Sequence, residues 1–212
     1  MNLDLYVITD ESIAGGLSSA EIARRSIAGG ADVIQLRDKC LTCAGLAAAG
    51  REIAAITRKA GAVFIVNDRL DVAIACGADG VHLGQDDLRV STARQLAPPG
   101  FIIGVSVGTA EEALEAEREG ADYLALSPTF STASKVNAGP GLGLGRLREI
   151  RMAVSIPVIA IGGITRQNAR DVIAAGAEGI AVISAVVGSP DITAAARELK
   201  ALIRESKRSR GR

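Results

Sequence analysis

The sequence has few aromatic residues, no tryptophan and no excess of charge of either sign. Aromatic residues make up 2% of the 212 positions, which leaves little surface for stacking against nucleic acid bases. The 24 basic and 24 acidic residues give a formal net charge of zero, so no overall field draws the chain to DNA or to an acidic membrane. We therefore expect no nucleic acid partner, and any phosphate binding must be local.

Long apolar runs are also missing from the sequence. No stretch approaches the roughly 20 apolar residues of a membrane span. The beginning of the chain, Met1-Asn-Leu-Asp4, lacks the positive region and apolar core of a secretory signal. We therefore predict a cytoplasmic protein without membrane contact, whose partners are small-molecule substrates, and the sequence leaves a homo-oligomer open.

Cysteine is scarce, and the three thiols form no recognisable framework. Cys40, Cys43 and Cys76 are an odd number, and the spacing of the first two lacks the second pair that a structural zinc site needs. We predict plain reduced thiols. The basic end of the chain, residues 206–212, is predicted to be a disordered tail outside a single domain of residues 1–205.

A short glycine-containing phrase recurs along the chain, each time between a helical pattern and an apolar strand pattern. Its four copies are Gly30-Ala-Asp32, Gly77-Ala-Asp79, Gly120-Ala-Asp122 and Gly176-Ala-Glu178. Glycine can adopt the left-handed conformation that ends a helix, after which the chain turns back into a sheet. The repeats therefore indicate successive βα units.

Eight apolar segments read as strands: Leu3 to Thr9, Val33 to Arg37, Val63 to Asn67, Gly80 to Leu83, Phe101 to Ser106, Tyr123 to Ser127, Val158 to Ile161 and Gly179 to Ile183. Helical spacing predicts helices over Ser19 to Ala28, Leu46 to Lys59, Thr109 to Glu119, Leu144 to Val154 and Gln167 to Ala175. Eight such units favour a single-domain α/β fold of the (β/α)8 TIM barrel type, with an open doubly wound sheet as the alternative.

Polar residues stand where several of the predicted strands end. In a closed barrel the active site lies at the carboxyl ends of the strands, so these residues are the candidates for chemistry. Asp68 and Asp87 are hard oxygen ligands from neighbouring strand ends, which suits Mg²⁺ completed by substrate phosphates. The alternative is that they cap helices that begin near Leu70 and Leu88.

Two glycine- and hydroxyl-rich segments are candidates for binding anions. Ser131 to Lys135 combines hydroxyls with an ammonium and is predicted to be a lid, although a solvated surface loop has the same composition. The Gly162-Gly163 pair and the segment at Ser184 follow the last two strands, where this barrel commonly binds phosphate. A simple turn is the alternative at the glycine pair.

The single histidine, His82, lies within the fourth predicted strand. We expect a structural, hydrogen-bonded side chain rather than a general base. The sequence contains no assembled Ser/His/Asp arrangement, no His-rich metal cluster and no P-loop, which leaves acyl transfer and nucleotide hydrolysis without support.

These motifs resemble the thiamine phosphate synthase family in order and approximate spacing. The similarity runs from Tyr6-Val-Ile-Thr9 to Val182-Ile-Ser-Ala185, and its most specific parts are Gln35-Leu-Arg-Asp-Lys39, Asn67-Asp68, His82-Leu-Gly-Gln-Asp-Asp87, Gly104-Val-Ser106, the loop that ends in Lys135, and Ile161-Gly-Gly-Ile164. The resemblance implies a transferase that joins 4-amino-2-methyl-5-hydroxymethylpyrimidine diphosphate to 4-methyl-5-(2-phosphoethyl)thiazole. The products are thiamine monophosphate and pyrophosphate.

The resemblance also implies a role for each matching residue. Mg²⁺ would be held by Asp68 and Asp87. The pyrimidine diphosphate would be held by Gln35, Leu36, Arg37, Asp38, Lys39, Asn67, Ser106 and Lys135. The thiazole phosphate would be held by Thr132, Ala133, Ser134, Gly163, Ile183 and Ser184. The catalytic groups would be Lys39, Lys135 and Ser106.

The expected reaction needs a stabilised leaving group rather than a strong base, because a pyrimidine methylene cation forms as pyrophosphate departs. The chain departs from the family pattern at Ser134, where a second threonine is usual, and at Gly108, where a polar residue is common. A thiazole tautomerase on the same barrel and a non-catalytic thiamine phosphate sensor remain alternatives.

Overall fold

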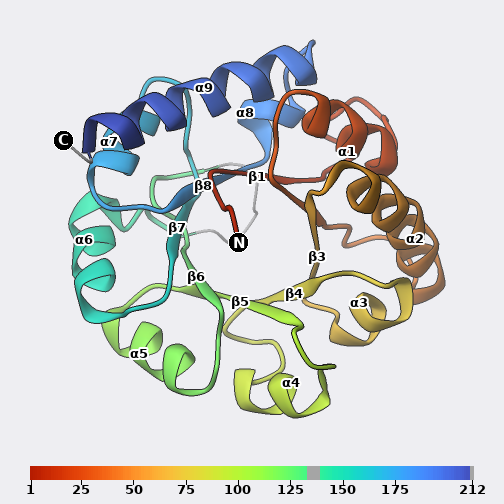
Figure 1. Cartoon of the computed structure of the whole chain (residues 1–212), viewed down its shortest axis with the longest axis horizontal. Helices are drawn as coiled ribbons and strands as arrows, with labels where there is room; N and C mark the ends of the chain where they lie inside the picture. The colour runs from red at the N-terminus through yellow and green to blue at the C-terminus, as the bar shows by residue number, and fades with distance from the viewer. Residues whose placement is uncertain (133–138, 211–212) are drawn as a thin grey trace.

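The computed structural model describes residues 1–132 and 139–210, and over these ranges the chain forms a closed barrel of eight parallel strands in sequence order. The strands are β1 (Leu5–Ile8), β2 (Val33–Leu36), β3 (Val63–Asn67), β4 (Gly80–Leu83), β5 (Ile102–Val107), β6 (Tyr123–Leu126), β7 (Val158–Ile161) and β8 (Gly179–Val182). Figure 1 looks along the barrel and shows the helices as an outer ring around the strands. The predicted (β/α)8 barrel is confirmed, and the open doubly wound sheet is excluded because β1 pairs with β8.

The ring contains α1 (Ser19–Ala28), α2 (Cys43–Ala60), α3 (Leu70–Cys76), α4 (Val90–Leu96), α5 (Ala110–Arg118), α6 (Gly143–Ala153), α7 (Ala169–Ala174), α8 (Ser184–Val187) and α9 (Ile192–Arg210). All five helices predicted from the spacing are present. The helix expected from Leu46 starts earlier, at Cys43, because the Thr42 hydroxyl caps it by accepting a hydrogen bond from the Gly45 N–H at 3.2 Å.

The recurring glycine phrase has two structural functions. Its glycines, Gly30, Gly77, Gly120 and Gly176, all have positive φ values, which confirms the left-handed turn predicted from the sequence. In three copies the acid that follows accepts a backbone N–H from the preceding strand: Asp32 from Leu5, Asp79 from Phe64 and Asp122 from Ile103, at 2.7 to 2.9 Å. Each acid thus joins two neighbouring strands at the amino-terminal end of the barrel.

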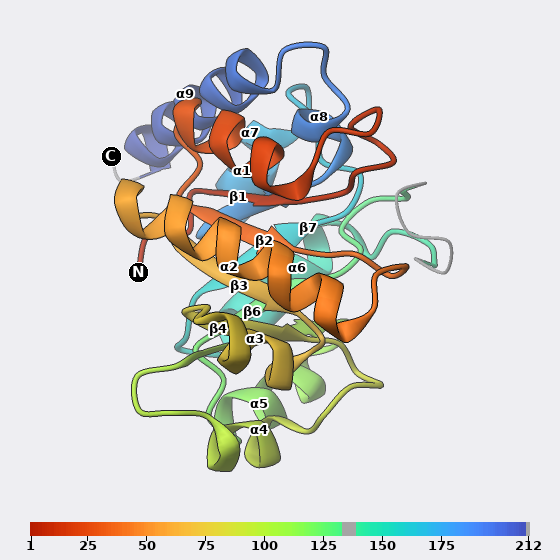
Figure 2. The ribbon, with the colours of Figure 1, turned by 90° about the vertical axis from the view of Figure 1, so that its right-hand side faces the viewer.

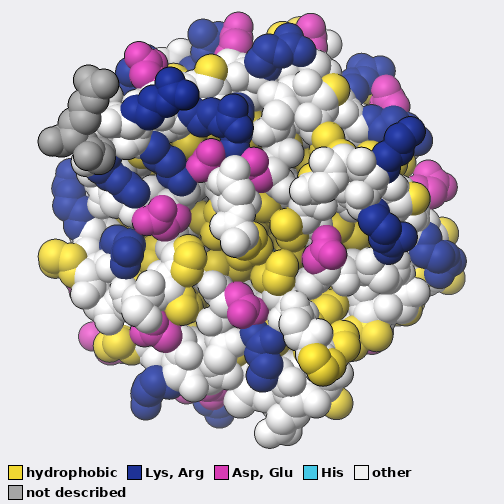
Figure 3. Space-filling view, viewed as in Figure 1, with side chains coloured by type: hydrophobic (Ala, Val, Ile, Leu, Met, Phe, Trp, Pro, Cys, Tyr) yellow, Lys and Arg dark blue, Asp and Glu magenta, His cyan; other side chains and the backbone are white. Residues whose placement is uncertain are grey.

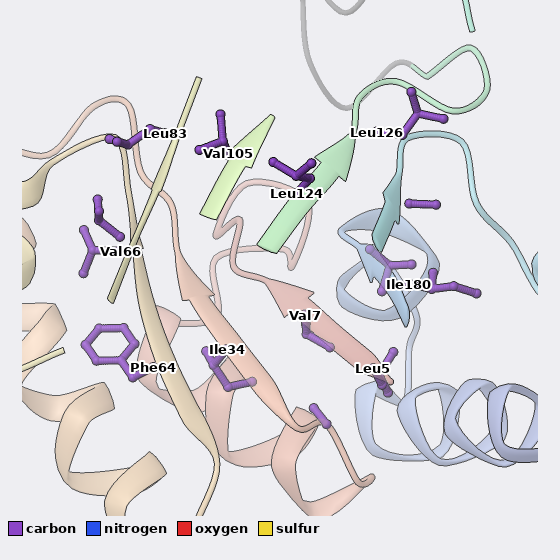
Figure 4. Close-up of a cluster of buried hydrophobic side chains, with 14 of the residues drawn as sticks. Leu5, Val7, Ile34, Phe64, Val66, Leu83, Val105, Leu124, Leu126 and Ile180 are labelled. Carbon is purple, nitrogen blue, oxygen red and sulfur yellow. The ribbon is translucent and has the colours of Figure 1, made fainter. Parts of the chain in front are cut away.

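Alternation along each strand divides the core into two layers. Leu5, Val7, Ile34 and Phe64 are buried in the layer between strands and helices, where Figure 4 shows side chains of successive strands. Their neighbours in sequence, including Tyr6, Ile8, Val33 and Ile65, form a second cluster inside the barrel. The alternation of side chains along each strand therefore decides which residues point into the barrel at the carboxyl ends of the strands.

The N-terminus and the C-terminal end of α9 lie at one end of the barrel, opposite the loops that follow β1 and β2 (Figure 2). Figure 3 shows this end, where apolar side chains at the centre are surrounded by acidic and basic ones. Within the described ranges, no helix is both long enough and apolar enough to cross a membrane.

The prediction of a disordered tail over residues 206–212 is wrong for residues 206–210, which continue α9 to Arg210. The physical reason is that the basic side chains find partners on the barrel. Lys207 Nζ lies 2.6 Å from Asp4 Oδ1, and Arg210 donates to the carbonyl oxygens of Ile173 and Ala177. Residues 211–212 lie outside the described residues.

Candidate functional site

The site is built at the carboxyl ends of the strands from side chains that the alternation turns inward. Gln35, Asn67 and His82 line a small cavity inside the barrel together with apolar residues of β1, β6, β7 and β8. Ser106 lies on β5 two residues beyond Gly104, the residue paired with His82, and its hydroxyl lies 3.0 Å from His82 Nε2. Four polar groups from four consecutive strands, β2 to β5, thus converge on one side of the barrel mouth.

Lys39 and Asp68 form an ion pair across the ends of β2 and β3. Among the residues that the structure describes, Asp68 is the one non-glycine residue with positive φ, at 61°. Its backbone N–H donates to the His82 carbonyl oxygen at 2.8 Å, which ties the strained residue to β4. Conformations of this kind cost about 1–3 kcal/mol and are typical of functional sites, where the surrounding structure enforces them.

Asp87 completes a group of three charged side chains. Its Oδ2 accepts the Gly84 N–H at 2.7 Å, which fixes the turn after β4. Loss of water contact, together with the neighbouring Asp68 carboxylate, raises the pKa of Asp87 above its usual value, even though Lys39 opposes the shift. A partly desolvated carboxylate with a second carboxylate beside it is a favourable arrangement for a divalent cation.

The alternative that these two acids cap helices is not supported. The residue before α3 is Arg69 and the residue before α4 is Arg89, and neither helix has a side-chain hydrogen bond at its amino-terminal cap. The Asp68 and Asp87 side chains instead contact Lys39 and Gly84. Among the described residues, no group of three or more His, Cys, Asp or Glu side chains could hold a metal.

The segment between Gln35 and Lys39 is held in place by the neighbouring loop after β1. The Arg37 N–H donates to Thr9 Oγ1 at 3.1 Å, and the Arg37 guanidinium lies 3.5 Å from Asp10. The Asp38 carboxylate accepts the N–H groups of Cys40 and Leu41 and so turns the chain into α2. These contacts present Lys39 to the barrel mouth.

Leu36 differs from the expectation of a substrate contact. Its side chain is fully buried in the layer between strands and helices, because its place in the alternation turns it away from the barrel interior. A contact with a ligand could come only from its backbone.

A pocket on the opposite side of the barrel mouth collects residues expected to bind the thiazole phosphate. It is lined by Thr132, Gly163, Ile183 and Ser184, among others. Gly163 has φ of +61°, and a Cβ there would lie 2.5 Å from the Ser131 carbonyl oxygen, so backbone approaches backbone at a distance that only glycine permits. The glycine pair is therefore more than a simple turn: it forms one wall of the pocket.

Three of the predicted site residues, Ala133, Ser134 and Lys135, lie outside the described residues. The remaining predicted residues divide into two groups on facing sides of the barrel mouth. The first group comes from β2 to β5 and the loops that follow them, and it consists of Gln35 to Lys39, Asn67, Asp68, Asp87 and Ser106. The second group consists of Thr132 and Gly163, from the loops after β6 and β7, and of Ile183 and Ser184, at the junction of β8 with α8.

Three residues near the site, Gln85, Tyr6 and Tyr123, were not among those predicted to have a role. The Gln85 amide donates to the Ser106 carbonyl oxygen at 2.6 Å, and the Tyr6 and Tyr123 hydroxyls lie 2.9 Å apart inside the barrel. The sequence does contain a hint, because its two tyrosines both fall within predicted strands. His82 is confirmed as a hydrogen-bonded barrel residue, with Nδ1 3.0 Å from Tyr123 Oη.

Fold and site together define a (β/α)8-barrel protein with charged groups and a glycine-walled pocket facing each other across the carboxyl ends of its strands. The family model described as thiamine monophosphate synthase matches residues 5–186. The chain belongs to this family.

Individual relatives agree with the family assignment over nearly the whole length. The thiamine-phosphate synthase of Methanoregula boonei is 67% identical over 207 residues, which cover 98% of this chain and 96% of the relative. The thiamine-phosphate synthase of Methanoculleus marisnigri is 62% identical over 207 residues, 98% of each chain. The solved thiamine phosphate pyrophosphorylase from Pyrococcus furiosus is similar with a TM-score of 0.90 and 44% identity, covering 97% of both chains.

Proposed function

We propose that this protein is a thiamine phosphate synthase, a transferase that joins the pyrimidine diphosphate and the thiazole phosphate named above. The observation that carries the proposal is the cluster of Lys39, Asp68 and Asp87 at the mouth of the barrel, facing the pocket walled by Gly163. One side has the groups that suit a diphosphate, and the other has a backbone wall that suits a single phosphate.

Asp68 and Asp87 are the residues that would hold Mg²⁺. Their oxygens fit a cation that takes one or two protein carboxylates and completes its octahedron with substrate phosphates and water. When bound, Mg²⁺ would neutralise negative charge on the diphosphate. The raised pKa of Asp87 supports this assignment: loss of water contact is its largest cause, the neighbouring Asp68 carboxylate adds to it, and a cation would stabilise both charges.

The bond that breaks joins the pyrimidine methylene carbon to the diphosphate oxygen, which leaves with the electron pair. Lys39 donates to the departing diphosphate, and Lys135 would do so from the loop after β6. The thiazole nitrogen then gives its lone pair to the methylene cation, so the C–N bond forms without a proton transfer. Holding two reactants in line can lower the barrier by about 7 to 11 kcal/mol.

Gln35, Asn67 and Ser106 would orient the pyrimidine, because they are the polar groups at the inner wall beneath Lys39. Thr132, Gly163 and Ser184 would hold the thiazole phosphate, and Ile183 would pack against its ring. We also infer a cytoplasmic location, which the three free thiols support.

The test is pyrophosphate release by the purified protein, measured with both substrates, with each alone, and with a chelator added. Release that requires both substrates and Mg²⁺ is the expected result. Binding of both substrates without release would favour a sensor. Isomerisation of a thiazole phosphate without Mg²⁺ would favour a tautomerase, and either outcome would overturn the proposal.

A further inference from the structure

A continuous line of hydrogen bonds crosses the barrel interior and joins two of the proposed pyrimidine-binding residues. Gln35 Nε2 lies 2.7 Å from Tyr6 Oη, which lies 2.9 Å from Tyr123 Oη. Tyr123 Oη lies 3.0 Å from His82 Nδ1, and His82 Nε2 lies 3.0 Å from Ser106 Oγ. The five side chains come from β2, β1, β6, β4 and β5, so the line spans the barrel from one wall to the other.

The direction of each hydrogen bond follows from counting protons. Both tyrosines are fully buried, and burial raises the pKa of Tyr6 and of Tyr123 above the usual value, so each phenol keeps its single proton. The Gln35 NH2 group can only donate, so the Tyr6 oxygen accepts there. Tyr6 must then donate its own proton to Tyr123. In the reverse order the Tyr6 O–H would face the Gln35 donor, and a buried unsatisfied donor costs about 1–3 kcal/mol.

The rest of the line is then determined. Tyr123 accepts from Tyr6 and donates to His82 Nδ1, so this nitrogen carries no proton. A neutral imidazole has its proton on the other nitrogen, and Nε2–H therefore donates to Ser106 Oγ. The Ser106 oxygen is already an acceptor from histidine, which leaves the serine proton to be donated to another group.

We infer that Tyr123 and His82 are positioning residues that present the Ser106 hydroxyl as a hydrogen-bond donor to an acceptor atom of the pyrimidine diphosphate, an inference that rests on the proposed function. The same arrangement prevents His82 from acting as a general base at Nε2, because that nitrogen holds its proton toward Ser106. A donor at this place orients an acceptor on the substrate and cannot remove a proton from it.

The barrel wall is shaped to hold Tyr123 in this line. Tyr123 pairs in register with Gly104 on β5, and a Cβ at Gly104 would lie 2.0 Å from the Tyr123 ring. The Tyr123 ring thus occupies the space of the missing side chain. The centroids of the Tyr6 and His82 rings lie 6.1 and 5.6 Å from that of Tyr123.

The tautomer can be measured directly, because the chain contains a single histidine. Nitrogen NMR of the full-length protein labelled at histidine should show Nε2 protonated and Nδ1 bare. Tyr123→Phe removes the donor that fixes Nδ1 as an acceptor, so the preference of the ring for the Nε2–H form should weaken. Tyr6→Phe is the matched control: it also deletes one buried hydroxyl, but Tyr123 can still donate to His82, so the tautomer should not change.

An Nδ1–H form in the unaltered protein would overturn the inference, as would the same tautomer change in both tyrosine variants. This readout needs no turnover. A failure of the proposed function, seen as absent pyrophosphate release, is therefore distinguished from a failure of the hydrogen-bond order.

Kinetics test whether Tyr123 acts through Ser106. We expect Tyr123→Phe to lower kcat/KM for the pyrimidine diphosphate by about tenfold, with the KM for the thiazole phosphate unchanged. Ser106→Ala should lower it at least as much, and the double variant should be no worse than Ser106→Ala alone, because the donor that Tyr123 orients is already gone. Multiplying effects in the double variant would show that Tyr123 acts independently of Ser106 and would overturn the positioning role.

Discussion

Lys200 Nζ lies 2.8 Å from Asp4 Oδ2, which joins α9 to the segment before β1 across 196 positions of the chain. The same ammonium lies 2.5 Å from Asp32 Oδ2, and Lys207 of the next turns of α9 lies 2.6 Å from Asp4 Oδ1. Lys200 is only 5% exposed. A buried cation from the last helix thus holds two acids that precede neighbouring strands, β1 and β2.

Replacing Lys200 with methionine should lower the free energy of unfolding by about 3 kcal/mol or more, because Asp32 and Asp4 lose a buried partner. Methionine retains most of the apolar length of lysine, so the loss reports the charge rather than the packing. Urea denaturation measures the change. Lys59→Met, at an exposed position near the end of α2, is the matched control and should change stability little. Equal effects at both positions would contradict the structural role of Lys200.

Removing residues 206–212 should destabilise the protein, although the sequence predicted a disordered tail there. The deletion removes the ion pair of Lys207 with Asp4 and the contacts of Arg210 with the carbonyl oxygens of Ile173 and Ala177. A loss of 1 kcal/mol corresponds to about 2–4 °C in Tm for a chain of this size. We expect a fall of several degrees in a thermal melt. Deleting only residues 211–212 keeps both side chains and should leave Tm nearly unchanged.

The environment of Asp4 leads us to expect that the free energy of unfolding falls at acid pH. Burial alone would raise its pKa, but hydrogen bonds from Lys200 and Lys207 outweigh burial and hold the pKa of Asp4 below its usual value. The folded state therefore binds a proton at Asp4 less readily than the unfolded state does. The contribution of the ionised Asp4 carboxylate to the free energy of unfolding is fully present above the ordinary pKa of aspartate, about 3.9. It is lost as the pH falls through the lowered folded pKa.

The measurement for Asp4 is a series of urea midpoints between neutral pH and the acid limb, for the unaltered chain and for Asp4→Asn. The variant should be less stable at neutral pH and should lose less further stability on acidification below the ordinary pKa. Parallel curves for the two proteins would show that Asp4 is not a source of the acid sensitivity.

Asp87→Asn should affect stability and activity in opposite directions. Without metal the variant should be as stable as the unaltered chain or slightly more, because the substitution removes a partly desolvated negative charge that lies beside the Asp68 carboxylate. The amide oxygen of asparagine can still accept the Gly84 N–H. Turnover should fall by about a hundredfold or more, and the rise in Tm on adding Mg²⁺ should disappear. Asp86→Asn, at the neighbouring exposed acid, is the matched control and should keep both the turnover and the rise in Tm on adding Mg²⁺. A variant at Asp87 that retains the Mg²⁺-dependent rise would show that the ion binds elsewhere.

The order of elements could be predicted from the sequence because each strand is a compact apolar run and each longer helix has its own period. The strands β3, β4 and β7 have the predicted bounds, and the others differ by one or two residues at one or both ends. The short helices α3, α4 and α8 were not predicted, since so few residues show little periodicity. The helix α9 was not predicted either, although at 19 residues it is the longest helix in the described ranges. The polar strand ends were predictable for the same reason as the strands: alternation places Gln35 and Ser106 inside the barrel.

The relationships between distant residues could not be predicted in this way. Tyr6 and Tyr123 are 117 positions apart, and nothing in either strand indicates that their hydroxyls meet. The basic end of α9 reads as a solvated tail until its acidic partner, Asp4, is placed beneath it by closure of the barrel. Both features depend on which strands become neighbours across the interior, and this is a property of the assembled fold.

Gly104 and Gly108, at the two ends of a short stretch of β5 and its loop, should respond differently to the same change. A Cβ at Gly104 would lie 2.0 Å from the Tyr123 ring, whereas at Gly108 the nearest described atoms, on Glu112 and Leu142, are 3.6 Å away. Gly104→Ala should therefore lower the free energy of unfolding by about 1–3 kcal/mol, the usual cost of overpacking.

Gly108→Ala should be nearly neutral, because its backbone has an ordinary φ and its Cβ would make only normal contacts. Urea denaturation compares the two variants. The histidine spectrum adds a second comparison: displacement of Tyr123 in Gly104→Ala should disturb the His82 tautomer, and Gly108→Ala should not. A Gly104→Ala protein with unchanged stability and an unchanged histidine spectrum would mean that the Tyr123 ring has room to move without leaving the hydrogen-bonded line.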